Sequence, residues 1–199
     1  MQSAFPEGFA AEMEALLGEE SARLLAALGR RPVRGLRLNG LKPSERLWAQ
    51  CQGLRAVPWC AEGRLAPEDL RPGRSPRHAA GLYYMQEPSA MAPAGALEVR
   101  PGERVLDLCA APGGKTTHLA SDMKSVGLLV SNEIHPARAK ILAQNVERMG
   151  IAHAVVTNET PDRLAERFPA FFHRIVVDAP CSGEGMFRKD PEACEQWSP

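Results

Sequence analysis

The stretch VLDLCAAPGGKTTHLA, residues 105–120, decides the fold. Its first part, Val105 to Cys109, is a short apolar run that is typical of a strand buried in a sheet. The next residues are small or Pro and predict a tight turn, and residues 116–123 predict a helix. A turn of small residues lets the backbone approach a ligand, and the helix that follows presents free N–H groups. Together these three parts predict a nucleotide-type binding loop.

The remainder of the C-terminal half alternates strands and helices. The expected strands are residues 104–109, 127–133, 154–157 and 174–178, and the expected helices are residues 89–97, 116–123, 136–149 and 161–168. This order predicts an α/β domain with a parallel sheet, whose ligand lies at the carboxyl ends of the strands. Complete sheets of this kind usually contain more strands, so we expect the fold to be incomplete in this chain.

The N-terminal part has a different pattern. Residues 5–28 predict two short helices and residues 33–39 predict a strand. Residues 58–81 are rich in Pro, Gly and Arg without any periodicity, and they predict a loop. We therefore expect a small α+β N-terminal domain over residues 1–86. The N-terminal part of the ligand-binding domain should occupy residues 87–199.

Composition indicates a soluble globular protein, because 44% of the 199 residues are hydrophobic and 24% are charged. The sequence contains no apolar run long enough to cross a bilayer and no secretory signal at its start, so we expect no membrane association. The five cysteines form no C-x-x-C pair. This argues against a disulfide framework and against a structural zinc site, and it favours a reducing compartment. We expect a cytoplasmic protein without a bound metal.

The net charge is zero, but the charges are unevenly distributed. Residues 1–22 carry five acids and no base, whereas residues 23–77 carry twelve Lys or Arg against four acids. Such an excess of basic residues can follow a phosphate backbone, so the N-terminal domain is a candidate for RNA contact. A solvated, arginine-rich surface is the alternative interpretation.

The residues around Gly113 exclude two familiar nucleotide loops. A Walker loop needs a glycine five positions before its Gly-Lys, and Cys109 stands there; G-x-G-x-x-G is also absent. Glu133 ends the second strand, where an acid can accept hydrogen bonds from both hydroxyls of a ribose. Arg138 is either a further cofactor contact or a solvated helix residue. Asn158 ends the third strand and can contact an adenine edge, although Asn is also common in loops.

The fourth expected strand ends in DAPCSGEG, residues 178–185. Asp178 and Cys181 then lie at the tip of a buried strand, facing the expected ligand cleft, and the glycines that follow suit a substrate loop. A lone cysteine is more often an inert small hydrophobe. The position of Cys181 after Asp-x-Pro, at the carboxyl end of a sheet, favours a functional role instead.

Two motifs in this order resemble a known family. CAAPGGK (109–115) and DAPCSGEG (178–185) are similar to motifs of the Sun/Nop family of RNA cytosine-C5 methyltransferases, as are YMQEPSAM (84–91) and WSP (197–199). The likeness extends from about residue 30 to the end of the chain. The short region before the cofactor loop is most similar to the bacterial branch that acts on small-subunit ribosomal RNA.

The resemblance implies a Rossmann-like S-adenosylmethionine-dependent methyltransferase fold. It also implies methylation of cytosine C5 in RNA, with 16S ribosomal RNA as the expected substrate. It implies S-adenosyl-L-methionine as the cofactor. The implied cofactor-binding residues are Cys109, Ala110, Ala111, Pro112, Gly113, Gly114, Lys115, Glu133 and Asp178, and Arg138 and Asn158 are added to them from their positions in the sequence. Asn158 stands where many members have Asp, so the adenine contact departs from the pattern.

The resemblance also implies the catalytic residues. Asp178 would contact the cytosine ring, and Cys181 would be a helper thiol that assists release of the methylated RNA. The nucleophile of the family is a second cysteine in a Thr-Cys motif, which we expect beyond residue 199. A thiolate that adds to C6 of cytosine makes C5 nucleophilic, and an acid at N3 stabilises that adduct.

Two other classes of function stay open. The first is a methyltransferase with another acceptor, such as transfer RNA, a protein or a small molecule. Asp-Ala-Pro-Cys in place of Asp-Pro-Pro-Tyr argues against methylation of an adenine amino group. The second is a non-catalytic RNA-binding assembly factor that keeps the cofactor fold, and the absence of a downstream Thr-Cys pair would favour it.

Overall fold

The computed structural model describes residues 5–6, 8–67, 72–180, 187 and 191–197. The chain divides into two compact units, Val33–Ala179 and a smaller one formed by Met1–Pro32 with Pro180–Pro199, and each is treated by itself. No helix in the described ranges combines the length and the apolar character that crossing a membrane requires.

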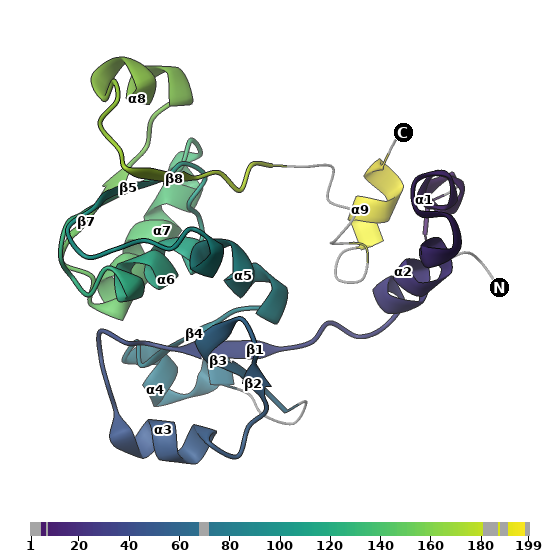
Figure 1. Ribbon diagram of the computed structural model, residues 1–199, viewed down its shortest axis with the longest axis horizontal. Helices are drawn as coiled ribbons and strands as arrows, with labels where there is room; N and C mark the ends of the chain where they lie inside the picture. Colours follow the sequence, from purple (N-terminus) through teal and green to yellow (C-terminus); the bar gives the residue numbers. More distant parts are fainter. Residues whose placement is uncertain (1–4, 7, 68–71, 181–186, 188–190, 198–199) are drawn as a thin grey trace. The chain divides into compact units, whose positions relative to one another are not determined.

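A parallel sheet forms the core of the larger unit (Figure 1). Its strands are β5 (Arg104–Asp107), β6 (Leu128–Asn132), β7 (Ala154–Thr157) and β8 (Arg174–Val176), in the order β7-β6-β5-β8. The helices between them are α6 (Gly114–Asp122), α7 (Pro136–Met149) and α8 (Pro161–Arg167). All adjacent strands are parallel, as the alternation of strands and helices predicts.

Alternation within the strands supplies two apolar faces. Val105 and Leu129 belong to a cluster with residues of α6 and α7, whereas Leu106 and Val130 pack with Leu164 of α8. Figure 1 accordingly shows α8 on the opposite side of the sheet from α6 and α7. Helices on both faces make this a doubly wound, Rossmann-like sheet.

The strand order places the ligand site. The chain moves from β5 outward to β6 and β7, and then returns to the other side of β5 to form β8. Ligands of doubly wound sheets bind where the strand order reverses, at the carboxyl ends of the strands. The loops that follow β5 and β8 are therefore the expected site.

The larger unit also contains a small antiparallel sheet. Its strands are β1 (Gly35–Leu38), β2 (Ala56–Val57), β3 (Cys60–Leu65) and β4 (Tyr83–Met85), in the order β2-β3-β1-β4. The elements around it are α3 (Glu45–Cys51), the 3-10 helix η2 (Pro72–Arg74), α4 (Pro76–Ala79) and α5 (Pro88–Ala96).

The expectation of a loop over residues 58–81 is wrong, because this range contains β3, η2 and α4. β3 has no alternating pattern, and Gly63 at its centre weakens any strand prediction. The strand forms because β1 and β2 pair with it on both sides. A Cβ on Gly63 would lie 2.9 Å from Met91 Sδ, so a glycine allows this close packing.

The smaller unit consists of α1 (Phe9–Leu17), the 3-10 helix η1 (Gly18–Glu20), α2 (Ser21–Leu28) and α9 (Pro191–Gln196). The two predicted N-terminal helices are present, with the interruption at Gly18. Its described core is aromatic: the ring of Phe9 lies 5.0 Å from that of Phe187 and 5.7 Å from that of Trp197, both edge-to-face. The two ends of the chain thus contribute to one cluster.

Candidate cofactor-binding site

The loop between β5 and α6 turns sharply at Gly113. This residue has a φ of 110°, a backbone conformation that L side chains rarely adopt, and a Cβ there would lie 3.2 Å from Leu142 Cδ1. Only glycine fits both requirements without strain. The missing side chain lets the loop pack closely against α7 at the start of α6.

Side chains from neighbouring elements hold the loop in place. Three of its carbonyl groups accept side-chain hydrogen bonds: Ala111 from Arg138 at 3.0 Å, Pro112 from Asn145 at 2.7 Å and Leu108 from Asn132 at 3.2 Å. Because these bonds are made by the protein alone, the loop has its shape before a ligand binds.

Arg37 of β1 supports the loop from the small sheet. Its guanidinium is 1% exposed, and it donates to the carbonyl of Gly114 at 2.9 Å, to Thr117 Oγ1 at 2.6 Å and to Gln86 Oε1. Burial lowers the pKa of Arg37 to about 10, so the group stays charged at neutral pH. The sequence interpretation missed Arg37, and its only signal was a charge between two leucines of a predicted strand.

Asp107, at the end of β5, is fully buried. Its Oδ2 accepts a hydrogen bond from Thr116 Oγ1 at 2.7 Å, whereas Oδ1 has no partner among the described residues. Burial raises the pKa of Asp107 to about 6. A buried carboxylate oxygen without a protein partner costs stability unless a ligand supplies one. Asp107 was also missed, although an acid that ends an apolar strand before a small-residue turn is a usable signal.

Glu133 follows β6 and is 3% exposed. Its Oε1 accepts from the backbone N–H of His135 at 3.0 Å, and its Oε2 lies 3.5 Å from Arg138 Nη1. Each carboxylate oxygen has two lone pairs, so these contacts leave acceptor capacity for ribose hydroxyls. Arg138 therefore connects the carboxylate of Glu133 with the carbonyl of Ala111.

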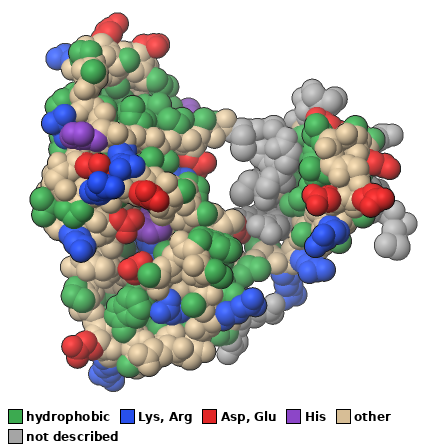
Figure 2. Space-filling view, viewed as in Figure 1, with side chains coloured by type: hydrophobic (Ala, Val, Ile, Leu, Met, Phe, Trp, Pro, Cys, Tyr) green, Lys and Arg blue, Asp and Glu red, His purple; other side chains and the backbone are tan. Residues whose placement is uncertain are grey.

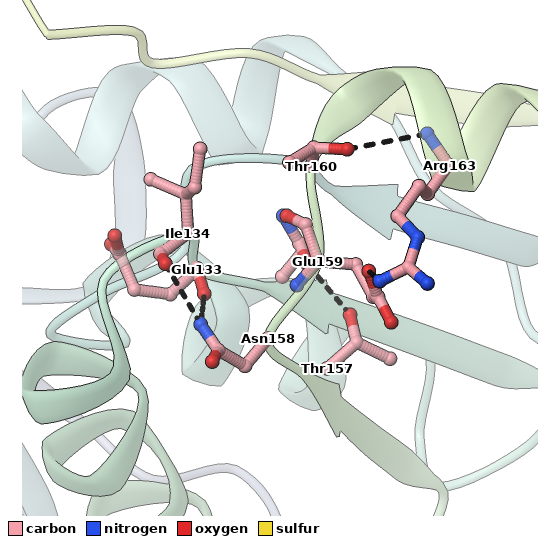
Figure 3. A network of polar contacts seen from close by, with 8 residues as sticks. Glu133, Ile134, Thr157, Asn158, Glu159, Thr160 and Arg163 are labelled. Carbon is pink, nitrogen blue, oxygen red and sulfur yellow. Dashed lines mark hydrogen bonds and ion pairs between the residues drawn. The ribbon is translucent and has the colours of Figure 1, made fainter.

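Asn158 follows β7 and lies beside Glu133 (Figure 3). Its Nδ2 donates to the backbone carbonyls of Glu133 at 2.6 Å and Ile134 at 2.9 Å. The amide donors are thus used within the protein, and Oδ1 is the atom that could accept from the amino group of an adenine. The sequence predicts that the Asn158 amide both donates to and accepts from adenine, whereas in the structure only the accepting role is left.

Asp178 follows β8, on the other side of β5. Its Oδ2 pairs with Lys115 Nζ from the first turn of α6, and its side chain is 60% exposed whereas that of Lys115 is 14% exposed. The two loops at the reversal of strand order are thus joined by an ion pair. Cys181, the other predicted catalytic residue, lies outside the described residues.

Cys109 lies in the cofactor loop, near several acidic side chains. Burial raises the pKa of its thiol, and the nearby carboxylates of Glu133, Asp107 and Asp178 raise it further. Such a thiol is poorly suited to act as a nucleophile, because the thiolate is the reactive form. The same carboxylates show that the acids of three different strand ends converge at this loop.

The strand order, the small-residue loop and the acids at the strand ends define a Rossmann-like S-adenosylmethionine-dependent methyltransferase domain. The chain belongs to the RsmB/F family of 16S rRNA methyltransferases, because residues 94–198 match that family and residues 5–88 match the N-terminal domain of 16S rRNA methyltransferase RsmF.

Individual proteins agree with this assignment. The chain is 42% identical to ribosomal RNA small subunit methyltransferase F of Enterobacter sp. (strain 638) and 38% identical to that of Escherichia coli O1:K1 / APEC. Each match covers 98% of this chain and 43% of the relative, so the chain spans less than half the length of these curated relatives. The crystal structure of a methyltransferase homolog protein from Pyrococcus horikoshii superposes with a TM-score of 0.78 at 33% identity, covering 89% of this chain and 61% of that one.

Proposed function

We propose that the chain is the cofactor-binding portion of an enzyme that methylates cytosine C5 in 16S ribosomal RNA. The observation that carries this proposal is the pairing of Asp178 with Lys115, which holds an exposed carboxylate beside the cofactor loop. The names of the relatives, ribosomal RNA small subunit methyltransferase F, support the choice of RNA.

The residues around the loop fit S-adenosylmethionine. The buried carboxylate of Glu133 would accept hydrogen bonds from the ribose hydroxyls, and Asn158 Oδ1 would accept from the adenine amino group. The unpartnered Oδ1 of Asp107 suits a ligand that carries a positive charge and amino donors. When bound, the cofactor supplies a methyl group on a positively charged sulfur.

Asp178 would hold the target base. Its carboxyl group is exposed enough to reach N3 of a cytosine, and the ion pair with Lys115 restricts its orientation. A base stacked in a helix does not expose its ring to a protein side chain, so the cytosine has to be single-stranded or flipped out.

Two cysteines would divide the covalent chemistry. We assign to Cys181 the release of the product, by assisting removal of the C5 proton or departure of the nucleophile. The attack on C6 would come from a cysteine of a Thr-Cys motif, and no such pair occurs in this sequence.

The N-terminal domain, residues 1–86, would contact the RNA. Of the basic residues that the sequence concentrates there, Arg37 is buried, whereas Arg34, Arg46 and Arg55 are exposed. On the face shown in Figure 2 the basic side chains are dispersed among apolar and acidic ones. This distribution favours several separate phosphate contacts.

The proposal is tested with the full-length protein and cofactor labelled with tritium in the methyl group. Separate pools of small-subunit RNA, transfer RNA, protein and metabolites are the acceptors, and we expect label in the small-subunit RNA alone, as 5-methylcytosine. Asp178→Asn should abolish transfer, whereas Asp162→Asn, on the exposed face of α8, should leave both transfer and cofactor binding unchanged. Label in another pool would contradict the proposal. So would the absence of label from every pool when the protein binds the cofactor.

A further inference from the structure

Three side chains with metal-binding atoms meet between the small sheet and helix α6, and a fourth lies beside one of them. Cys60 and Glu62 share a face of β3, because alternate residues of a strand point the same way, and His118 and Asp122 are one turn apart on α6. Cys60 Sγ, His118 Nε2 and a carboxylate oxygen of Glu62 all lie within 4.8 Å of one another. His118 Nε2 also lies 3.7 Å from Asp122 Oδ2.

His118 has no short hydrogen bond that accounts for its burial. Its side chain is 5% exposed, and its Nδ1 has no partner within the described ranges. Its Nε2 faces Cys60 Sγ at 3.8 Å and Asp122 Oδ2 at 3.7 Å. Zinc binds sulfur, nitrogen and oxygen at about 2.0–2.3 Å, which separates the ligand atoms of a tetrahedral site by about 3.4–3.7 Å. The separation of Cys60 Sγ and His118 Nε2 is close to that of two atoms that share one ion.

The protonation states also suit a metal. Burial lowers the pKa of His118 to about 3, so its imidazole is neutral and has a free lone pair at neutral pH. Burial, followed by the charge of Glu62, raises the pKa of Asp122 to about 6, so it is mostly ionised at neutral pH. A metal ion would replace the proton of the Cys60 thiol, because thiolate is the form that binds metals.

Arg37 adds a positive charge beside this cluster, because its buried guanidinium interacts with Cys60, Glu62 and Asp122. Burial raises the pKa of the Cys60 thiol, so this thiol stays neutral until a metal ion displaces its proton.

We propose that Cys60, Glu62 and His118 bind one Zn²⁺ ion, which fastens the small sheet to helix α6, with Asp122 beside His118. Thiolate and imidazole ligands exclude Mg²⁺ and Ca²⁺, which prefer oxygen, and a set of N, S and O ligands is typical of zinc. No C-x-x-C pair marks this site, because its ligands come from distant elements and Cys60 and His118 are 58 positions apart. The ion would lie behind the cofactor loop, since α6 begins at Gly114.

The chain offers a matched control for this site. Cys51 and Cys60 are both free cysteines that are 5% exposed, but Cys51 packs against Leu36 and Leu47 in the core of the small sheet. Cys51→Ser and Cys60→Ser therefore make the same chemical change at the same depth, and only the second removes a proposed ligand.

The test measures zinc by mass spectrometry after the chelated protein has been dialysed against Zn²⁺. We expect one zinc per chain in the wild type and in Cys51→Ser. Cys60→Ser should weaken zinc binding by more than the roughly 10–100-fold that loss of an outer-shell partner costs. Co²⁺ should show a thiolate charge-transfer band in the wild type and in Cys51→Ser, and no such band in Cys60→Ser.

A folded wild-type chain that binds no zinc would overturn the proposal, and so would equal zinc and cobalt signals from Cys60→Ser. Circular dichroism of each variant shows whether it is folded. If Cys60→Ser is unfolded, Glu62→Gln replaces it, because that side chain is partly exposed and easier to change. Unchanged zinc affinity in Glu62→Gln would then contradict the three-ligand arrangement.

Discussion

Asp107→Asn tests the carboxylate at the end of β5 without changing its shape. In the folded chain this fully buried group has a pKa of about 6, raised from 3.8 mainly because burial disfavours the charged form. The folded state then binds the proton more tightly than the unfolded state does. Stability therefore falls as the pH rises from about 4 to about 6, where the folded state has to release the proton.

The size of the effect follows from the two pKa values. Between about pH 4.5 and about pH 7.5 the wild type should lose roughly 2 kcal/mol of unfolding free energy through Asp107 alone. Asn cannot ionise, so the loss between these two pH values should be smaller by about that amount in the variant. The comparison uses the change with pH, because an unpartnered Asn amide can itself shift the absolute stability.

Urea unfolding of the cofactor-free chain, with chelator present, measures this difference at both pH values. Asp122 titrates in the same range and stays in every variant, so its contribution cancels. Asp162→Asn removes an exposed acid on α8 and should keep the wild-type difference. If Asp107→Asn also keeps it, the carboxyl of Asp107 is not the group that destabilises the fold, and its assignment as an acceptor kept for the cofactor fails.

Three further outcomes are expected. Glu133→Gln should weaken binding of S-adenosylmethionine in calorimetry by ~1–3 kcal/mol, because a buried acceptor is replaced. Glu147→Gln, on the exposed side of α7, is the control, and equal affinities of the two variants would refute the ribose contact. Arg37→Lys keeps the charge but loses the planar guanidinium that donates to three acceptors, so it should lower the free energy of unfolding in urea by ~1–3 kcal/mol. A variant as stable as the wild type would show that the network is not stabilising. Cys181→Ala in the full-length protein should accumulate a covalent RNA adduct that survives denaturing electrophoresis; no band, with normal melting, would argue against the helper role.

The C-terminal half was predictable because its signals are local. Helix α7 has the predicted bounds, with Pro136 in its first turn and Gly150 beyond its end. β7 also has the predicted bounds, and its neighbours in the sheet follow from the alternation of strands and helices. Repeated strand–helix units leave few ways of arranging a parallel sheet, so the ligand could be expected at the carboxyl ends of the strands, whereas the strand order itself was not predicted.

The small sheet was less predictable because its strands are held by partners from far along the chain. β3 has neither alternation nor β-branched residues, and its pairing with β1 sets its position. Arg37 likewise looks like an ordinary basic residue in the sequence. Its role depends on Gly114, 77 positions away, and no spacing rule connects the two.

The hydrogen bond from Arg37 to Gly114 couples the conformation of the small sheet energetically to the conformation of the cofactor loop. If a bound cofactor stabilises this network, then a molecule that binds the small sheet in the same conformation must raise the affinity for the cofactor. The cofactor must in turn raise the affinity for that molecule by the same factor. RNA that bound the small sheet in that conformation would meet the condition. Substrate and methyl donor would then bind cooperatively, with Arg37 connecting the two parts of the chain.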